Sequence, residues 1–127
     1  MPNPEFVIYT GPMFGGKTTR LLGEVERYRY KKRPILAYKP AIDNRYDSES
    51  IVTHNGFKLK AKKIINALEI SEDLSRSCLP IADRPIVVID EAFMIKDIGM
   101  VLPNIFKDGY TILVSTLQLS ASGKPFE

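Results

Sequence analysis

Residues 11–18 read Gly-Pro-Met-Phe-Gly-Gly-Lys-Thr and follow a short apolar run at 6–10, Phe-Val-Ile-Tyr-Thr. In this Gly-x-x-x-x-Gly-Lys-Thr pattern the glycines allow several backbone N–H groups to point at one anion. Lys17 carries a positive charge toward the β- and γ-phosphates of a nucleotide, and the Thr18 hydroxyl is a ligand for Mg²⁺. The pattern predicts a strand, a phosphate-binding loop (P-loop) and a helix from Lys17 onward, and hence a nucleoside triphosphate ligand. The candidate nucleotide-binding residues of the loop are Gly11, Pro12, Met13, Phe14, Gly15, Gly16, Lys17 and Thr18.

The composition sets limits on the rest of the chain. Its 127 residues are 44% apolar, enough for one ordinary core, so we expect 1–127 to form a single nucleotide-binding domain. The net charge of +3 does not predict nucleic-acid binding. Cys78 is the only cysteine, so we expect neither a disulfide framework nor a cysteine-based zinc site within this sequence. No apolar run approaches the length of a membrane span, which favours a cytoplasmic protein.

Helical spacing predicts three helices. Apolar residues recur at 21, 22, 25 and 28, so the helix after the loop has one buried face. We expect it to end near Arg33, because Pro34 disfavours helix in the residue before it. Residues 71–79 suggest a short helix with Ser71 as its N-cap. Residues 98–107 suggest a third helix despite Pro103, with a glycine at 109 beyond its end.

Apolar runs predict strands at 35–38, 86–89 and 110–114. The run Ile-Val-Val-Ile at 86–89 is typical of a strand buried on both faces of a sheet. Residues 51–53 and 57–61 flank His-Asn-Gly, and Asn-Gly between alternating segments favours an antiparallel hairpin. Strands that alternate with helices predict an α/β fold. We therefore expect a P-loop NTPase (RecA-like) parallel sheet with flanking helices and the hairpin as an insertion.

The pair Asp90-Glu91 is a second chemical signal, because it directly follows the apolar run at 86–89. Ligand sites in parallel α/β sheets open at the carboxyl ends of the strands, where the glycine-rich loop also lies. Asp90 is then expected to be the acidic partner of the Mg²⁺ that Thr18 binds, and Glu91 beside it is available as a base. The alternative is an exposed acidic pair that caps the next helix. The combination with the loop favours the functional interpretation.

These motifs resemble those of the type II (cellular and bacterial) thymidine kinases. Residues 11–18 are similar to the family's Gly-Pro-Met-Phe-Ser-Gly-Lys loop, and residues 89–92 resemble its Asp-Glu-Ala/Gly-Gln-Phe motif. Between them, and in the family's order, residues 39–46 are similar to its Lys-x-x-x-Asp-x-Arg-Tyr block. Residues 53–56 resemble its Ser/Thr-His-Asn/Asp block. The likeness covers essentially the whole chain.

The resemblance implies a kinase that transfers the γ-phosphate of ATP to the 5′-hydroxyl of thymidine, with Mg²⁺ and a homo-tetrameric assembly. Glu91 would be the base for that hydroxyl, and Arg45 would neutralise charge on the transferring phosphoryl group. Asp43 would orient Arg45 or the waters of the metal. Thr18 and Asp90 would organise Mg²⁺.

The same resemblance places Met13 and Leu117 in the lining of the nucleoside pocket. The chain departs from the family around this pocket. Phe93 stands where the family has Gln, and Met94 stands where it has an aromatic residue. These departures leave the selectivity for base and sugar open.

A further departure concerns length. The family continues into a small C-terminal domain with a cysteine-held zinc and a lasso loop that closes over the base, and the present sequence stops at Glu127, where that domain is expected to begin. We therefore expect the nucleotide-binding core alone, either truncated or part of a longer coding unit.

Two other function classes remain open. A nucleotide-binding module without kinase activity would bind ATP and transfer nothing. A P-loop ATPase acting on nucleic acid would use the basic residues at 27–33. The acids Glu24 and Glu26 lie beside this basic cluster and weaken that interpretation. His54, the only histidine, has no partner ligands with which to bind a metal.

Overall fold

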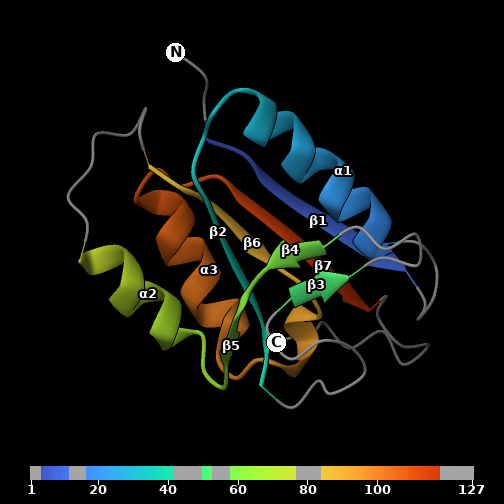
Figure 1. Ribbon diagram of the computed structural model, residues 1–127. Helices are drawn as coiled ribbons and strands as arrows, with labels where there is room; N and C mark the ends of the chain where they lie inside the picture. The colour runs from blue at the N-terminus through green and yellow to red at the C-terminus, as the bar shows by residue number, and fades with distance from the viewer. Residues whose placement is uncertain (1–3, 12–16, 42–49, 53–57, 77–83, 118–127) are drawn as a thin grey trace.

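The computed structural model describes residues 4–11, 17–41, 50–52, 58–76 and 84–117 (Figure 1). Its main sheet has five strands, all paired in parallel, in the order β1-β7-β6-β2-β5. These strands are β1 (Phe6–Gly11), β2 (Ile35–Pro40), β5 (Lys62–Ile64), β6 (Ile86–Ile89) and β7 (Ile112–Leu117). Two further strands, β3 (Ser50–Val52) and β4 (Lys58–Lys60), form a separate antiparallel ribbon. The predicted α/β fold, with its parallel sheet and hairpin insertion, is confirmed.

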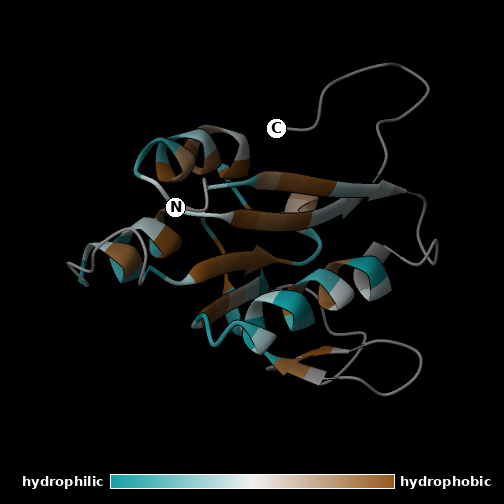
Figure 2. Cartoon of the chain, turned by 90° about the horizontal axis from the view of Figure 1, so that it is seen from above, coloured by the Kyte–Doolittle hydropathy of each residue, from teal (hydrophilic) through white to brown (hydrophobic). Residues whose placement is uncertain are grey.

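Helices cover both faces of the main sheet, and the apolar strands lie between them (Figures 1 and 2). The helices are α1 (Lys17–Tyr30), α2 (Leu68–Ser75), α3 (Ile98–Lys107) and the 3-10 helix η2 (Ala92–Met94). One apolar cluster joins α1 to the sheet and the hairpin, and we call this side the α1 face. A second cluster joins α2 and α3 to the opposite side, the α2/α3 face. In the part of the chain that the structure describes, no helix is long and apolar enough to cross a bilayer.

The strand β6 shows how the sequence builds both clusters. All four of its residues are buried. Ile86 and Val88 belong to the cluster of the α1 face, and Val87 and Ile89 belong to that of the α2/α3 face. Successive side chains of a strand point to opposite faces, so a continuous apolar run is needed when both faces are covered. The predicted strand at 86–89 is confirmed with the same bounds.

The helix α1 buries the four residues whose spacing predicted it, but it ends at Tyr30 and not near Arg33. Lys32 adopts a left-handed conformation with φ 59°. The N–H groups of Lys32 and Arg33 donate to the carbonyls of Arg29 and Tyr28 at 2.8 and 3.1 Å. This is the Schellman arrangement that closes many helices. It turns the chain before Pro34, so the helix stops earlier than the proline alone predicts.

The prediction that Ser71 caps a helix at 71–79 is wrong, because α2 already begins at Leu68 and ends at Ser75. The Asn66 side-chain oxygen accepts the N–H of Leu68 at 2.8 Å, and the Glu69 carboxylate accepts the N–H of Asn66 at 3.2 Å. This reciprocal pair resembles a capping box and lies just before the N-cap position, Ala67. It satisfies the N–H of Leu68, the first residue of the helix, so the helix begins before Ser71 is reached.

The remaining elements follow the predictions with differences in their bounds and one added strand: β2 runs to Pro40 and not to 38, and β7 begins at Ile112 and not at 110. The third helix spans the predicted 98–107, and Gly109 beyond it has φ 92°, a conformation that favours glycine. The last strand, β7, runs to Leu117 and not to 114, because Ser115 and Thr116 stay in register with β1. The edge strand β5 was not predicted, since three residues that include two lysines carry no strand pattern.

Candidate active site

The carboxyl ends of β1, β7 and β6 meet at one edge of the sheet. The first strand ends at Gly11 and α1 begins at Lys17, so the strand and helix predicted around the glycine-rich loop are confirmed. The Arg20 guanidinium donates to the carbonyl of Thr10 at 3.2 Å, which ties the first turn of α1 to the end of β1. Residues 12–16 lie outside the described residues, as do the side chains of Lys17 and Thr18.

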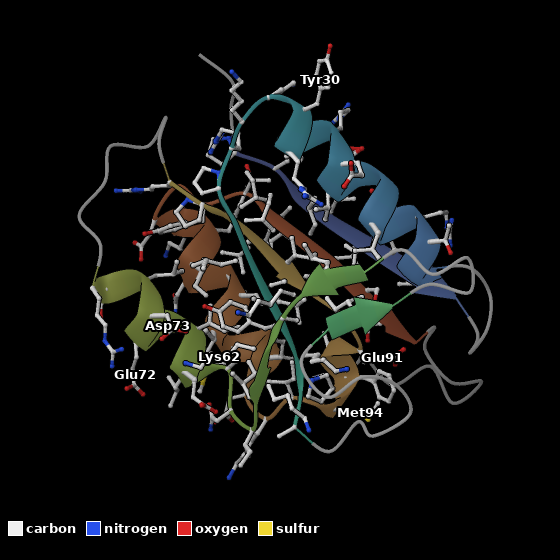
Figure 3. All side chains as sticks on the ribbon, in the orientation of Figure 1. Tyr30, Lys62, Glu72, Asp73, Glu91 and Met94 are labelled. Carbon is white, nitrogen blue, oxygen red and sulfur yellow. The ribbon has the colours of Figure 1, made fainter. Side chains whose placement is uncertain are left out.

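Asp90 and Glu91 lie at this edge, directly after β6. Their exposed fractions are 8% and 3%, so the alternative of an exposed acidic pair is wrong. The N–H of Asp90 donates to the carbonyl of Tyr38 in β2 at 3.0 Å, which continues the sheet pairing by one residue. Figure 3 shows Glu91 beside Met94 at this end of the molecule. The acidic pair therefore lies at the carboxyl end of a buried strand, as predicted, and its roles toward Mg²⁺ and the hydroxyl stay predictions.

Between the acidic strand and the strand that leads into the loop lies β7, and it contributes Ser115. Ile89 of β6 is opposite Val114 of β7, so Ser115 follows opposite Asp90. The Ser115 hydroxyl donates to Oδ1 of Asp90. The same hydroxyl oxygen accepts the backbone N–H of Glu91 at 3.3 Å. One fully buried side chain thus contacts both acidic residues.

Glu91 stands at a turn between β6 and η2. Its backbone is left-handed, with φ 55° and ψ 45°, which is uncommon for a residue other than glycine. The carbonyl of Glu91 accepts the N–H of Met94 at 3.1 Å. The backbone N–H and the carbonyl of Glu91 are therefore both hydrogen-bonded. Met94, predicted to lie near the nucleoside, is half-buried in η2 next to this turn.

A buried cation occurs at the same level of the sheet. Lys39 is 2% exposed, and it follows Tyr38, which is the register partner of Ile89. Lys39 therefore lies level with Asp90 on the neighbouring strand. Because Ala37 packs on the α1 face, alternation places Lys39 on that face too. The strand was predicted to end at 38, so Lys39 was seen only as the first residue of the block at 39–46 and was given no role.

Other predicted site residues fall outside the described residues. These are Met13, Asp43, Arg45 and the single histidine, His54. The backbone of Leu117 is described, and it is the register partner of Gly11 at the end of β1. This register brings Leu117 to the same edge as the beginning of the glycine-rich segment.

The chemistry of Asp90 fits a magnesium ion. Mg²⁺ takes oxygen ligands and is commonly held by one or two carboxylates together with substrate phosphates and water. Asp90 supplies a carboxylate at the edge of the sheet where α1 begins, and the Ser115 hydroxyl holds its Oδ1. Asp90 and Thr18 are the residues that would hold the ion. Within the described residues, no group of three His, Cys, Asp or Glu side chains is arranged to hold a metal by itself.

A parallel sheet with a Gly-x-x-x-x-Gly-Lys-Thr segment after its first strand, and an acidic pair at the end of an inner strand, defines the class of P-loop phosphotransferases and NTPases. A sequence model described as thymidine kinase matches residues 5–127. The match includes nearly all of the chain, and the protein belongs to the thymidine kinase family. The resemblance seen in the sequence motifs is confirmed.

Proposed function

We propose that this protein is an ATP-dependent deoxynucleoside kinase that transfers the γ-phosphoryl group of ATP to the 5′-hydroxyl of thymidine. The observation that carries the proposal is the buried pair Asp90-Glu91 at the end of β6. Only β7 lies between β6 and β1, the strand that leads into the glycine-rich segment. Membership of the thymidine kinase family supports ATP and a nucleoside as the two substrates. The position of the acidic pair and the family match over residues 5–127 both favour phosphoryl transfer.

The proposed reaction needs a base for the proton of the 5′-hydroxyl and a group that neutralises charge on the phosphate oxygens. The 5′ oxygen of the nucleoside attacks the γ-phosphorus, and its proton passes to the Glu91 carboxylate. The bond from the γ-phosphorus to the β–γ bridging oxygen breaks, which leaves ADP and a nucleoside 5′-monophosphate. Mg²⁺, when bound, neutralises charge that develops on the phosphate oxygens. Asp90, the residue before Glu91, would anchor that ion, so the two functions stand on consecutive residues.

The remaining roles are assigned from the motifs. Lys17 and the backbone amides of 11–16 would hold the β- and γ-phosphates. Arg45 would neutralise charge on the transferring group, and Asp43 would orient Arg45 or the waters of the metal. Met13, Met94 and Leu117 would contact the nucleoside.

The alternative of an ATPase that acts on nucleic acid has weaker support. Two of the basic residues of α1 are already engaged with acids. Arg27 lies 2.6 Å from the Glu24 carboxylate, and Arg29 lies 2.9 Å from that of Glu26. A phosphate backbone would have to compete with these ion pairs for the same cations.

The decisive experiment is transfer of labelled γ-phosphate from Mg-ATP to thymidine, followed by separation of the nucleotide product. We expect Lys17→Ala to abolish transfer. Glu91→Gln should lower kcat by about 10²- to 10⁴-fold, the usual contribution of a general base, while the affinity for ATP stays nearly unchanged. The matched control is Glu72→Gln, because Glu72 is an exposed glutamate on α2 (Figure 3). It should retain full activity.

Each alternative function has its own outcome in this assay. Binding of ATP without any transfer would support a nucleotide-binding module. Release of phosphate that increases with added DNA or RNA, and not with thymidine, would support the ATPase. Near-normal transfer by Glu91→Gln would show that Glu91 is not the base.

A further inference from the structure

A single hydroxyl group links the two acidic residues of the candidate site. Ser115 donates to Oδ1 of Asp90 and accepts the N–H of Glu91 at 3.3 Å. A backbone N–H can only donate, so the serine oxygen must be the acceptor toward Glu91. The hydroxyl hydrogen is therefore available for Asp90, whose Oδ1 acts as the acceptor. This arrangement suits Asp90 in its carboxylate form, which is the form that binds a metal.

The position of Ser115 follows from the sheet order. Its strand, β7, is hydrogen-bonded to β1 on one side and to β6 on the other. Leu113, two residues earlier on the same side of the strand, packs into the cluster of the α1 face. Ser115 thus lies on that face at the carboxyl edge, with no exposed surface. A buried polar group destabilises the fold unless it is hydrogen-bonded, and this hydroxyl is bonded twice.

The neighbouring residue provides an internal comparison. Thr116 is also buried, at 2% exposure, but alternation turns it to the α2/α3 face. Its hydroxyl has no hydrogen-bond partner among the described residues. Two adjacent hydroxyls on one strand are therefore equally hidden from water, and only Ser115 contacts the acidic pair. Burial of a hydroxyl in β7 does not by itself account for the double contact.

The backbone conformation of Glu91 gives a structural reason for its hydrogen bond with Ser115. A left-handed conformation is unfavourable for a non-glycine residue and persists only when its surroundings hold it. The N–H of Glu91 is held by Ser115, and its carbonyl is held by the N–H of Met94 at 3.1 Å. Loss of the Ser115 hydroxyl would free the turn on one side. It would also remove one of the hydrogen bonds that orient the Asp90 carboxylate.

We propose that Ser115 is a positioning residue for phosphoryl transfer: its hydroxyl fixes the carboxylate of Asp90 and the backbone turn from which Glu91 projects. The inference rests on the proposed function, because it assigns Asp90 to the metal and Glu91 to the base. It adds a residue from a strand that carries no acidic motif. Groups that orient a metal ligand typically contribute about 10- to 100-fold to metal affinity or activity.

The test compares two substitutions of equal shape at one position. Ser115→Thr keeps a hydroxyl and Ser115→Val replaces it by a methyl group, and both β-branched side chains suit a strand. We expect Ser115→Thr to stay close to wild type. Ser115→Val should lower kcat by about 10- to 100-fold and raise the Mg²⁺ concentration needed for half-maximal activity, with little change in the KM for thymidine. Thr116→Val is the control and should leave both quantities unchanged.

A second readout is independent of turnover. Mn²⁺ binding in the presence of a non-hydrolysable ATP analogue, followed by electron paramagnetic resonance, should weaken by about 10-fold in Ser115→Val and not in Ser115→Thr or Thr116→Val. Equal kcat and equal Mn²⁺ affinity in the two Ser115 variants would overturn the inference and leave Ser115 as a core hydroxyl. If wild type binds Mn²⁺ and the analogue but transfers no phosphate, the proposed function fails, and the Mn²⁺ comparison still decides the role of Ser115.

Discussion

The two faces of the sheet differ in their last layer of side chains. On the α2/α3 face, the apolar side chains of β6 and β7 continue up to Ile89 and Val114, and Ala92 of η2 extends the cluster. The buried Thr116 follows Val114 on this face, and its hydroxyl has no hydrogen-bond partner among the described residues. On the α1 face, the apolar residues Val88 and Leu113 are followed, two positions later, by Asp90 and Ser115. Both faces therefore share one construction for most of their length. The side chains of the two faces differ in kind only at the carboxyl ends of the strands.

This difference shows how the position of a residue along a strand decides which face of the sheet carries its side chain. Side chains alternate, so Asp90, which directly follows β6, lies on the α1 face. This is the side on which α1 begins after the glycine-rich segment. An acid placed one residue earlier would point to the α2/α3 face, among apolar side chains. The α1 face carries buried polar groups that contribute less to stability than apolar ones would, a pattern expected at functional sites.

The largest expected effect tests the apolar layer. Ile112 is fully buried on the α2/α3 face, near the amino end of β7 and away from the acidic pair. Ile112→Ala should lower the free energy of unfolding by about 2–5 kcal/mol, because it removes buried methyl groups and leaves a cavity. Urea denaturation measures the loss. The kcat for transfer, measured where the variant remains folded, should stay close to wild type; a large fall in kcat would show that the two faces are not separate in function.

The next effect tests the polar layer. Asp90→Asn keeps a side-chain oxygen that can accept the Ser115 hydroxyl, so the free energy of unfolding should change by less than about 1 kcal/mol. Transfer of phosphate should fall by about 10²- to 10³-fold, because the site loses a charge that would anchor Mg²⁺. Parallel measurements of kcat and of the urea midpoint would check both expectations. A variant that unfolds readily but turns over normally when folded would reverse the contrast between the faces.

The sequence predicted the parts of this contrast that depend on local pattern. The run at 86–89 must be apolar throughout because both faces are covered, and the strand has the predicted bounds. The acidic pair after it was identified from its place at the strand end. Edge strand β5 was missed because its pairing with β2 is its only strand signal. The start of α2 was missed because the cap is formed by Asn66 and Glu69.

Ser115 could not have been identified from the sequence. A serine in the last predicted strand carries no local signal, and the strand was predicted to end one residue before it. Its role depends on the strand order, which inserts β7 between β1 and β6, and on a register that sets Ser115 against Asp90. Both are properties of pairing between segments far apart in the chain: Ser115 and Asp90 are 25 residues apart, and the β1–β7 pairing joins Phe6 to Ile112.

The smallest expected effect compares one tyrosine from each face. Tyr28 of α1 donates to the Glu5 carboxylate at 2.5 Å, and Tyr38 of β2 donates to that of Asp73 at 2.9 Å. Burial first, and then the hydrogen bond to Glu5, raises the pKa of Tyr28 from 10.0 to about 12. Burial and the hydrogen bond to Asp73 raise the pKa of Tyr38 further in the same direction. Both hydroxyls stabilise the fold in their neutral form.

The sign of the pH dependence follows from the raised pKa values. The contribution of Tyr28 is complete below about pH 10, where the unfolded tyrosine is also neutral, and is lost as the pH rises from about 10 to about 12. Tyr28→Phe should cost about 1 kcal/mol at pH 7, and the difference from wild type should disappear over that window. For Tyr38→Phe the loss begins at the same pH and continues beyond 12. Urea unfolding of the three proteins from pH 8 to 12 measures this, and a difference for Tyr28→Phe that persists unchanged at pH 12 would mean that its hydroxyl is not held by Glu5 in solution.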